Sequence, residues 1–182
     1  MSIIKNIRTS FGKFFYRKKL ANTSRNIKLI NMTQVRSAAI IFDANNANNL
    51  KHVKELVKHI PVDAGISVMG YIDGKKENFS YIGDNVYSFV AEADFDFFMR
   101  PKPGIIPGFI EKQFDVLFVL HNKYLFEVDM LTGLSNARLK VGQSGDYAKN
   151  LDFIIETKDN NTSYLISQIL HYMNNITTTN VV

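Results

Sequence analysis

The sequence contains no cysteine. Disulfide bonds, cysteine nucleophiles and thiolate metal sites are therefore excluded, and a reducing cytoplasm is the natural compartment to expect. No apolar run approaches the length needed to span a bilayer, and the start of the chain lacks the continuous apolar stretch and the small-residue cleavage site of a secretory signal. We therefore expect a cytoplasmic protein that is either free or peripheral at the inner face of the membrane.

Acidic residues are missing from the first 42 positions, which carry nine basic residues. The remainder of the chain has 13 basic and 17 acidic residues, a balance of −4, and the whole chain has a formal net charge of +5. The protein therefore combines a mildly acidic body with a basic arm. This asymmetry predicts an anionic partner for the arm, either a membrane surface or a nucleic acid.

The basic arm has a helical pattern of apolar residues, which predicts an amphipathic helix over residues 2–19. Gly12 weakens this helix by about 1 kcal/mol relative to alanine. The apolar positions, which gather on one helical face, are Ile3, Ile4, Ile7, Phe11, Phe14 and Phe15. The basic residues that we expect to bind an anionic surface are Lys5, Arg8, Lys13, Arg17, Lys18, Lys19 and Arg25.

Three interpretations of the arm stay open. Its apolar stripe can pack on the body, with the basic residues as the solvated face, as aromatic stripes at helical spacing usually do. It can dock in a membrane interface, with phenylalanines at the headgroup boundary and basic residues on anionic lipid. It can also bind RNA or the ribosome, mainly through its charge.

The rest of the chain has the pattern of one α/β domain. The stretch from Phe114 to Gly142 reads as strand, helix and strand, and the run Val116–Leu120 has no polar alternation, as expected of a strand covered on both faces. Strands are expected near residues 38–42, 66–72, 116–120, 139–141 and 152–155. Alternation with helices predicts a mostly parallel sheet of about five strands with helices on both faces.

The length of 182 residues suits this single domain plus an appendage. We expect an arm and linker over residues 1–30, the α/β domain over 31–176 and a frayed tail over 177–182. Within the least regular part, residues 75–113, a strand is expected inside Phe89–Phe98 and a short apolar turn over Ile105–Ile110. Asparagines near residue 160 are expected to cap a terminal helix.

Loops that follow the expected strands are the candidate ligand site, because open parallel sheets bind ligands outside the carboxyl ends of their strands. The candidate residues are Asp43, Asn45, His121, Asn122, Gly142, Ser144 and Gly145. The loop Gly142–Gly145 either offers backbone N–H groups to a phosphate or is a plain turn. The chain has no G-x-G-x-x-G motif, P-loop or G-x-S-x-G elbow. We therefore assign no catalytic residue, no metal ligand and no cofactor.

Two further groupings of polar residues have a plain structural explanation beside a functional one. The first set, His52, Glu55 and His59, could present metal ligands on one helix face, but interleaved lysines favour a solvated face. The second resembles the D-x-D metal–diphosphate grip of some glycosyltransferases, and equally any half-exposed strand. The second set is Glu92, Asp94 and Asp96.

The motifs Phe42-Asp43-Ala44, Phe114-Asp-Val-Leu117 and Ala137-Arg-Leu-Lys-Val-Gly142 resemble an uncharacterised family of short Rossmann-like proteins from Bacteroidota. Locally, the strand from Phe114 and the segment Ser135–Gly142 are similar to the N-terminal domain of heptosyltransferase-type glycosyltransferases. The second resemblance implies the fold but not the activity, because that family binds its activated sugar mainly in a second domain. We therefore expect no glycosyl transfer.

These observations favour a non-enzymatic α/β binding or adaptor module. Its basic arm would dock on an anionic membrane surface or pack against a protein partner, and the sheet or its edge would be offered to such a partner. An RNA- or ribosome-associated factor is one alternative. A small-ligand binder or degenerate glycosyltransferase-like half-domain is the other.

Overall fold

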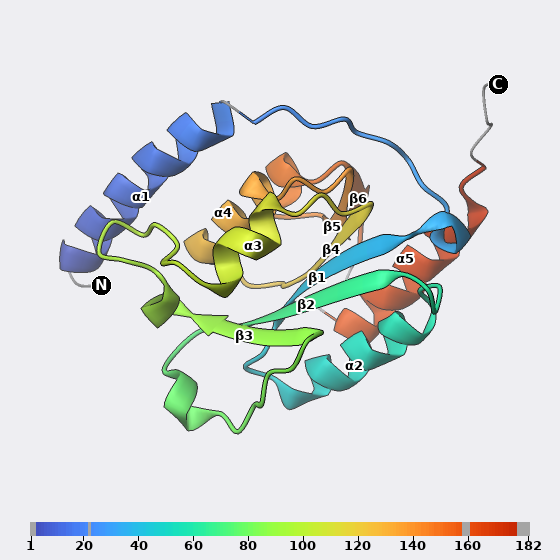
Figure 1. The fold of residues 1–182 in the computed structure, drawn as a ribbon, viewed down its shortest axis with the longest axis horizontal. Helices are drawn as coiled ribbons and strands as arrows, with labels where there is room; N and C mark the ends of the chain where they lie inside the picture. The colour runs from blue at the N-terminus through green and yellow to red at the C-terminus, as the bar shows by residue number, and fades with distance from the viewer. Residues whose placement is uncertain (1–2, 22, 158–160, 178–182) are drawn as a thin grey trace.

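The computed structural model describes residues 3–21, 23–157 and 161–177, and it leaves aside the side chains of residues 3–6 and 78. Six strands and five α-helices make up its main elements (Figure 1). The strands are β1 (Ser37–Asp43), β2 (Gly65–Ile72), β3 (Tyr87–Ala91), β4 (Val116–Leu120), β5 (Leu139–Gln143) and β6 (Phe153–Ile155). The helices are α1 (Ile3–Ala21), α2 (Ala47–Lys58), α3 (Ile105–Glu111), α4 (Phe126–Leu134) and α5 (Thr162–Asn175). Four short 3-10 turns are η1 (Met32–Gln34), η2 (Lys76–Asn78), η3 (Glu92–Asp94) and η4 (Ala148–Asn150).

The strands form one sheet in the order β3-β2-β1-β4-β5-β6, and every pairing in it is parallel. This is the order of doubly wound nucleotide-binding folds, in which the direction of winding reverses between the first and fourth strands. The predicted fold class, a mostly parallel α/β sheet with helices on both faces and an N-terminal helix, is confirmed. The sheet has one strand more than the five expected.

Each face of the sheet has its own apolar core. Alternate residues of β1 point to opposite faces, so Ala39 and Ile41 join one core while Ile40 and Phe42 join the other. Helices α3 and α4 cover the first face, and α2 and α5 cover the second (Figure 1). The five residues of β4 are all buried, which explains the continuous apolar run seen in the sequence.

Helix α1 adds a further layer outside α4 (Figure 1). All nine residues of α4 are buried, including Glu127, Asp129 and Thr132. A helix that faces a sheet on one side can be buried all round only if something covers its outer side. Helix α1 supplies part of that cover, so the described part of the arm lies on the domain. The predicted boundary at residue 30 stays a prediction.

Two sequence expectations need correction, and the expected asparagine cap of the terminal helix is confirmed. Residues 105–111 form helix α3 instead of a short turn, with Ile106, Phe109 and Ile110 buried beneath it. The strand expected within 89–98 is β3, which starts earlier and stops at Ala91, where Asp94 turns back to accept the Ala91 N–H. Terminal helix α5 is capped by Asn161, whose side chain accepts from the Tyr164 N–H. Most of the expected frayed tail, residues 178–182, lies outside the described residues.

Candidate functional site

The carboxyl ends of β1, β2 and β4 lie side by side at one edge of the sheet, because these neighbouring strands are parallel. The Asn45 side chain bridges to the backbone of Asp73, donating to its carbonyl at 3.1 Å and accepting from its N–H at 2.8 Å. Lys123 forms an ion pair with the Asp73 carboxylate from the other side. Asp43 accepts from the Asn45 N–H at 2.9 Å and so fixes the turn that starts this bridge. The three loops are therefore joined by polar contacts.

His121 is buried at the switch point between β1 and β4, directly after β4. Its Nδ1 lies 2.8 Å from the Lys123 carbonyl oxygen, which can only accept, so Nδ1 carries the proton and Nε2 has the lone pair. Nε2 has no hydrogen-bond partner among the described residues. Burial lowers the pKa of His121, and the nearby Asp43 carboxylate only partly opposes this. The result is a neutral imidazole with a buried acceptor nitrogen.

The glycine loop is placed differently from the sequence prediction. Gly142 belongs to β5, where it pairs with Val119 of β4 and Ile154 of β6, so it is not a loop residue. Ser144 continues this pairing by donating its N–H to the Ile155 carbonyl at 2.9 Å. Only the end of the motif turns, at Gly145, whose φ is +136°. These residues and Asn122 share the carboxyl edge of the sheet, but β4 separates β5 from Asp43.

Helix α1 meets the body through a face that the sequence pattern did not indicate. Tyr16 is buried, and its hydroxyl lies 3.1 Å from Asn150 Oδ1, while Asn150 donates to the Asp129 carboxylate at 2.7 Å. Burial raises the pKa of Tyr16 to about 12. One turn earlier Gly12 packs so closely that a Cβ there would lie 2.7 Å from both Met99 and Phe126. Close approach is therefore why glycine occupies this position.

Two of the predicted anion-binding arginines are used inside the protein. Arg25 makes a two-pronged ion pair with Asp152, at 2.6 and 3.0 Å, and donates to the Ala137 carbonyl at 2.9 Å. Arg8 pairs with Glu92 at 2.5 Å and donates to the Phe97 carbonyl at 3.2 Å. These two arginines fasten the arm to the body. The other predicted basic residues with described side chains are exposed, namely Lys13, Arg17, Lys18 and Lys19.

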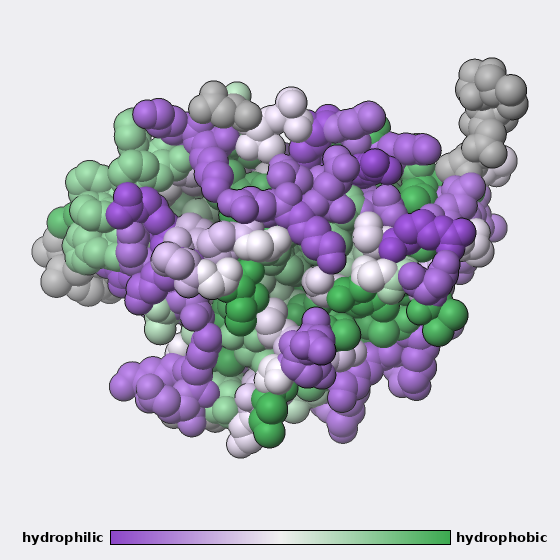
Figure 2. Space-filling view, viewed as in Figure 1, coloured by the Kyte–Doolittle hydropathy of each residue, from purple (hydrophilic) through white to green (hydrophobic). Residues whose placement is uncertain are grey.

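The predicted apolar stripe of α1 stays exposed. Phe14 is 63% accessible, and the loop before α3 adds Phe97 at 52%. Figure 2 shows light green atoms gathered over α1 at the upper left of the molecule. We call this surface the phenylalanine patch, and its members are Ile7, Phe11, Phe14, Phe15, Phe97 and Phe98. Side chains of the other predicted stripe residues, Ile3 and Ile4, and of Lys5 lie outside the description.

Ring contacts join the two halves of the phenylalanine patch. Phe98 lies edge-on to Phe11, with ring centroids 5.6 Å apart, and to Phe15 at 6.3 Å. The Arg100 guanidinium lies over both Phe15 and Phe98, at 5.6 and 5.3 Å from their centroids. Sequence analysis missed the contribution of Phe97, Phe98 and Arg100, because they come from a segment more than 80 residues away. Two adjacent phenylalanines beside a basic residue were the available signal.

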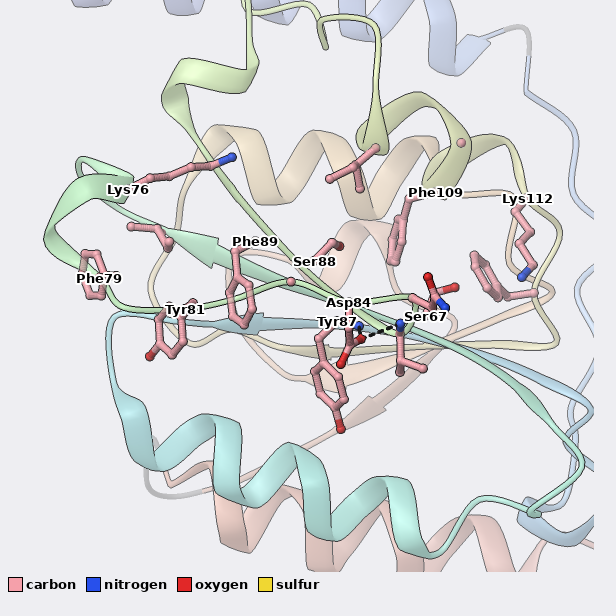
Figure 3. A pocket seen from close by; sticks show the side chains of 17 residues that line it. Ser67, Lys76, Phe79, Tyr81, Asp84, Tyr87, Ser88, Phe89, Phe109 and Lys112 are labelled. Atoms are coloured by element: carbon pink, nitrogen blue, oxygen red, sulfur yellow. Dashed lines mark hydrogen bonds between the residues drawn. The ribbon is translucent and has the colours of Figure 1, made fainter.

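A cavity of about 620 Å³ lies along β3 and α3. Figure 3 shows Phe79, Tyr81 and Phe89 in a row, with Phe109 and Lys112 on the α3 side. Tyr81 and Phe89 are stacked, with centroids 4.4 Å apart. The backbone of the adjoining edge strand is closed near both ends, because Asp84 accepts from the Tyr87 N–H and Asp94 from the Ala91 N–H. These contacts oppose the addition of a partner strand at β3.

The two weaker polar groupings are engaged in local contacts. Asp94 pairs with Lys76 and Asp96 with Arg100, and the acids lie on η3 and the loop after it instead of sharing one face of a strand. Glu55 pairs with Lys58 at 2.7 Å on the surface of α2. Within the described residues, no group of three histidine or acidic side chains is arranged to hold a metal ion.

None of the helices in the described ranges combines the length and the apolar character that a membrane span requires. No curated protein and no solved structure matches the chain. A family match does exist, and it covers residues 8–176, from Arg8 within α1 to Ile176, the residue that follows α5. The expected resemblance to an uncharacterised family is thereby confirmed: the chain belongs to the family of unknown function DUF6913.

Proposed function

We propose that the protein is a non-enzymatic α/β binding module that docks on an anionic membrane surface through the phenylalanine patch. The observation that carries this proposal is the exposure of six large apolar side chains, from two distant segments, beside basic residues of the same helix. Contiguous apolar surface of this kind marks an interaction site more often than scattered single residues do.

The composition of the surface favours a lipid interface. A basic amphipathic helix with phenylalanine on one side and lysine or arginine on the other suits the plane between headgroups and acyl chains. Lys13, Arg17 and Lys18 stand on α1 beside the patch. Each basic residue near an anionic bilayer contributes about 1 kcal/mol, and this contribution weakens with salt. Phenylalanine insertion adds an apolar contribution that does not depend on charge.

The fixed seat of α1 on the body supports the same proposal. Tyr16, Gly12, Arg8 and Arg25 hold the helix, so the patch is presented without first ordering a disordered arm. Preorganisation of this kind lowers the entropic cost of binding. The body would then be carried at the membrane surface, with its carboxyl-edge loops and its outer helices left available.

Co-sedimentation with lipid vesicles tests the proposal. Wild-type protein is expected to pellet with vesicles containing phosphatidylglycerol and not with pure phosphatidylcholine, and to keep residual binding at high salt. Phe11→Ser/Phe14→Ser should abolish the binding that remains at high salt. Both side chains are exposed, so their loss leaves the core intact. The control is Val62→Ser/Ile82→Ser, which removes two apolar side chains that are still more exposed and lie outside α1.

RNA binding is the competing outcome of this experiment. A factor held by RNA phosphates should bind structured RNA, ignore vesicles and lose affinity with a log–log salt slope of about −0.7 to −0.9 per phosphate contacted. If affinity for RNA falls steeply with rising salt and the Phe11→Ser/Phe14→Ser change does not affect it, RNA would replace the membrane as the proposed anionic partner.

A second candidate, a small-ligand binder, rests on the buried acceptor nitrogen of His121 at the switch point of the sheet. A buried polar atom without a partner needs an explanation, of which a bound group is one, and ligands of this fold bind at this edge. The expected ligand offers a hydrogen-bond donor to Nε2. A thermal-shift screen that stabilises wild-type protein but not His121→Phe would support it.

The remaining resemblances bear on this second candidate. A degenerate half-domain of a heptosyltransferase-type enzyme would use the same edge, but this comparison is one of fold alone and carries no activity. An origin in Bacteroidota, suggested by the resembling motifs, is likewise an expectation. Turnover of a nucleotide sugar by the purified protein would overturn the non-enzymatic proposal.

A further inference from the structure

A second cavity, of about 450 Å³, lies between α1, α3 and α4, next to the phenylalanine patch. Its floor is made of buried apolar side chains from three parts of the chain, Met99, Ile110, Met130 and Leu134. Phe15 and Tyr16 of α1 line its wall, as do Pro101 and Pro107. We call this cavity the α1 cleft. Its size falls within the range of cavities that hold small apolar ligands.

Basic residues gather on the lining of the α1 cleft. Lys18, Lys19 and Arg100 all line it, against one acidic residue, Glu111, among the described lining residues. Arg100 is paired with Asp96 at 2.6 Å, whereas Lys18 and Lys19 form no ion pair within the described parts of the chain. The cleft therefore combines an apolar interior with two ammonium groups that lack an anionic partner in the described structure.

The backbone at Met99 supports a role for this cleft. Met99 has a φ of +60°, a conformation that side-chain-bearing residues rarely adopt. Strain of this kind persists where the surroundings enforce it, and it gathers at binding sites. Here it holds the Met99 side chain over Gly12 and on the floor of the cleft. Met99 and Met130 also give that floor adaptable, unbranched side chains, which suit a flexible apolar ligand.

We propose that the α1 cleft binds the hydrocarbon tail of a long-chain fatty acid, whose carboxylate contacts the ammonium groups of Lys18 and Lys19. An ammonium–carboxylate contact is charge-assisted and so contributes more than a neutral hydrogen bond. Phe15 belongs to both the phenylalanine patch and the cleft, which makes the two surfaces continuous. The inference rests on the proposed function, because docking brings the mouth of the cleft to the bilayer surface where fatty acids partition.

Displacement of a dansyl-labelled undecanoic acid from full-length protein tests this site. Palmitate below its micellar concentration should displace the probe at one site per chain, whereas octanoate and the uncharged glycerol monopalmitate should compete weakly. Lys18→Glu/Lys19→Glu should lower the affinity for palmitate by about tenfold or more, given the strength of hydrogen bonds to charged groups. The matched control, Lys13→Glu/Arg17→Glu, makes the same charge change on the same helix outside the cleft and should leave palmitate affinity within about twofold.

A second variant separates the cleft from the membrane surface. Pro107→Phe places a larger side chain at the half-buried wall of the cleft and should remove palmitate binding while vesicle binding persists. Vesicle binding without palmitate binding in the wild type would overturn this inference and leave the membrane proposal standing. Palmitate binding without vesicle binding would overturn the membrane proposal and leave the fatty-acid site standing. Equal loss in both charge-reversal variants would show attraction by net charge only and would also overturn the inference.

Discussion

Tyr16 of α1 lies directly over Gly133 of α4. A Cβ added to Gly133 would fall 2.8 Å from Tyr16 Cζ and closer still to the hydroxyl oxygen, a separation that real side chains do not show. The seat of the N-terminal helix therefore depends on the absence of a side chain in a different helix.

Gly133→Ala is accordingly expected to lower the free energy of unfolding by about 1–3 kcal/mol, the usual cost of overpacking a core. Gly108→Ala is the matched control, since Gly108 is also helical and an added Cβ there meets nothing within 4 Å. That change should be neutral or stabilise by up to about 1 kcal/mol, because alanine is the better helix former. Urea unfolding of both variants measures this, and equal effects would argue against the packing of α1 on α4.

Removing Arg25 from its pair with Asp152 should destabilise the protein much more than breaking a surface ion pair does. Both side chains are largely buried, at 14% and 10% accessible, and Asp152 also accepts from the Lys140 N–H at 2.9 Å. Arg25→Met would leave a buried carboxylate without its partner, at an expected cost of about 3–5 kcal/mol. Arg36→Met breaks the exposed pair with Asp63 and should cost about 1 kcal/mol or less. Chemical denaturation distinguishes the two, and similar losses would contradict the buried placement of Arg25.

Stability should rise with pH from about 6 to 9. Burial, aided by nearby Arg25, lowers the pKa of Lys140 to about 7, below its unfolded value of 10.5. Between those pKa values the unfolded chain binds more protons than the folded one. The free energy of unfolding therefore increases as the pH is raised. The lowered pKa of His121 acts in the same direction below its unfolded value of 6.5. Above about pH 10 the buried tyrosines reverse the trend, because burial raises the pKa of Tyr16.

Lys140→Met isolates the lysine contribution. In the folded protein Lys140 Nζ donates to the Gly133 carbonyl at 2.9 Å near the end of α4, so its effect is local to the α1–α4–β5 junction. The variant should show a flatter pH dependence of urea midpoints between pH 7 and 9 than the wild type. An unchanged slope would show that Lys140 keeps an ordinary pKa in the folded state.

The fold could be predicted because its main signals are local. A continuous apolar run such as Val116–Leu120, followed by a helical period and another strand, requires a parallel pair and a crossover. Short β3 and α3 were harder, since contacts distant in sequence hold them: β3 pairs with β2, and the Asn136 N–H donates to the Ile110 carbonyl of α3 at 3.1 Å. Gly142 was placed in a loop because a glycine suggests a turn, whereas it lies in β5 against the Val119 carbonyl and Leu151.

The candidate site was predicted in part. The strand-end residues Asp43, Asn45 and His121 could be placed together, because the carboxyl ends of parallel strands share one edge. The orientation of α1 could not be predicted from hydrophobicity. Its packing face is built on Gly12 and Tyr16, and a glycine contributes to close packing through the side chain it lacks.

Insertion of the phenylalanine patch into an anionic bilayer can be measured at a single position. The chain has no cysteine, so Phe14→Cys provides one labelling site for a polarity-sensitive fluorophore, and Val62→Cys provides the matched exposed site away from α1. On vesicles containing phosphatidylglycerol, the probe at position 14 should shift to the blue and become shielded from an aqueous quencher, and the probe at position 62 should change little. No shift at position 14, or equal shifts at both positions, would contradict membrane docking through the patch.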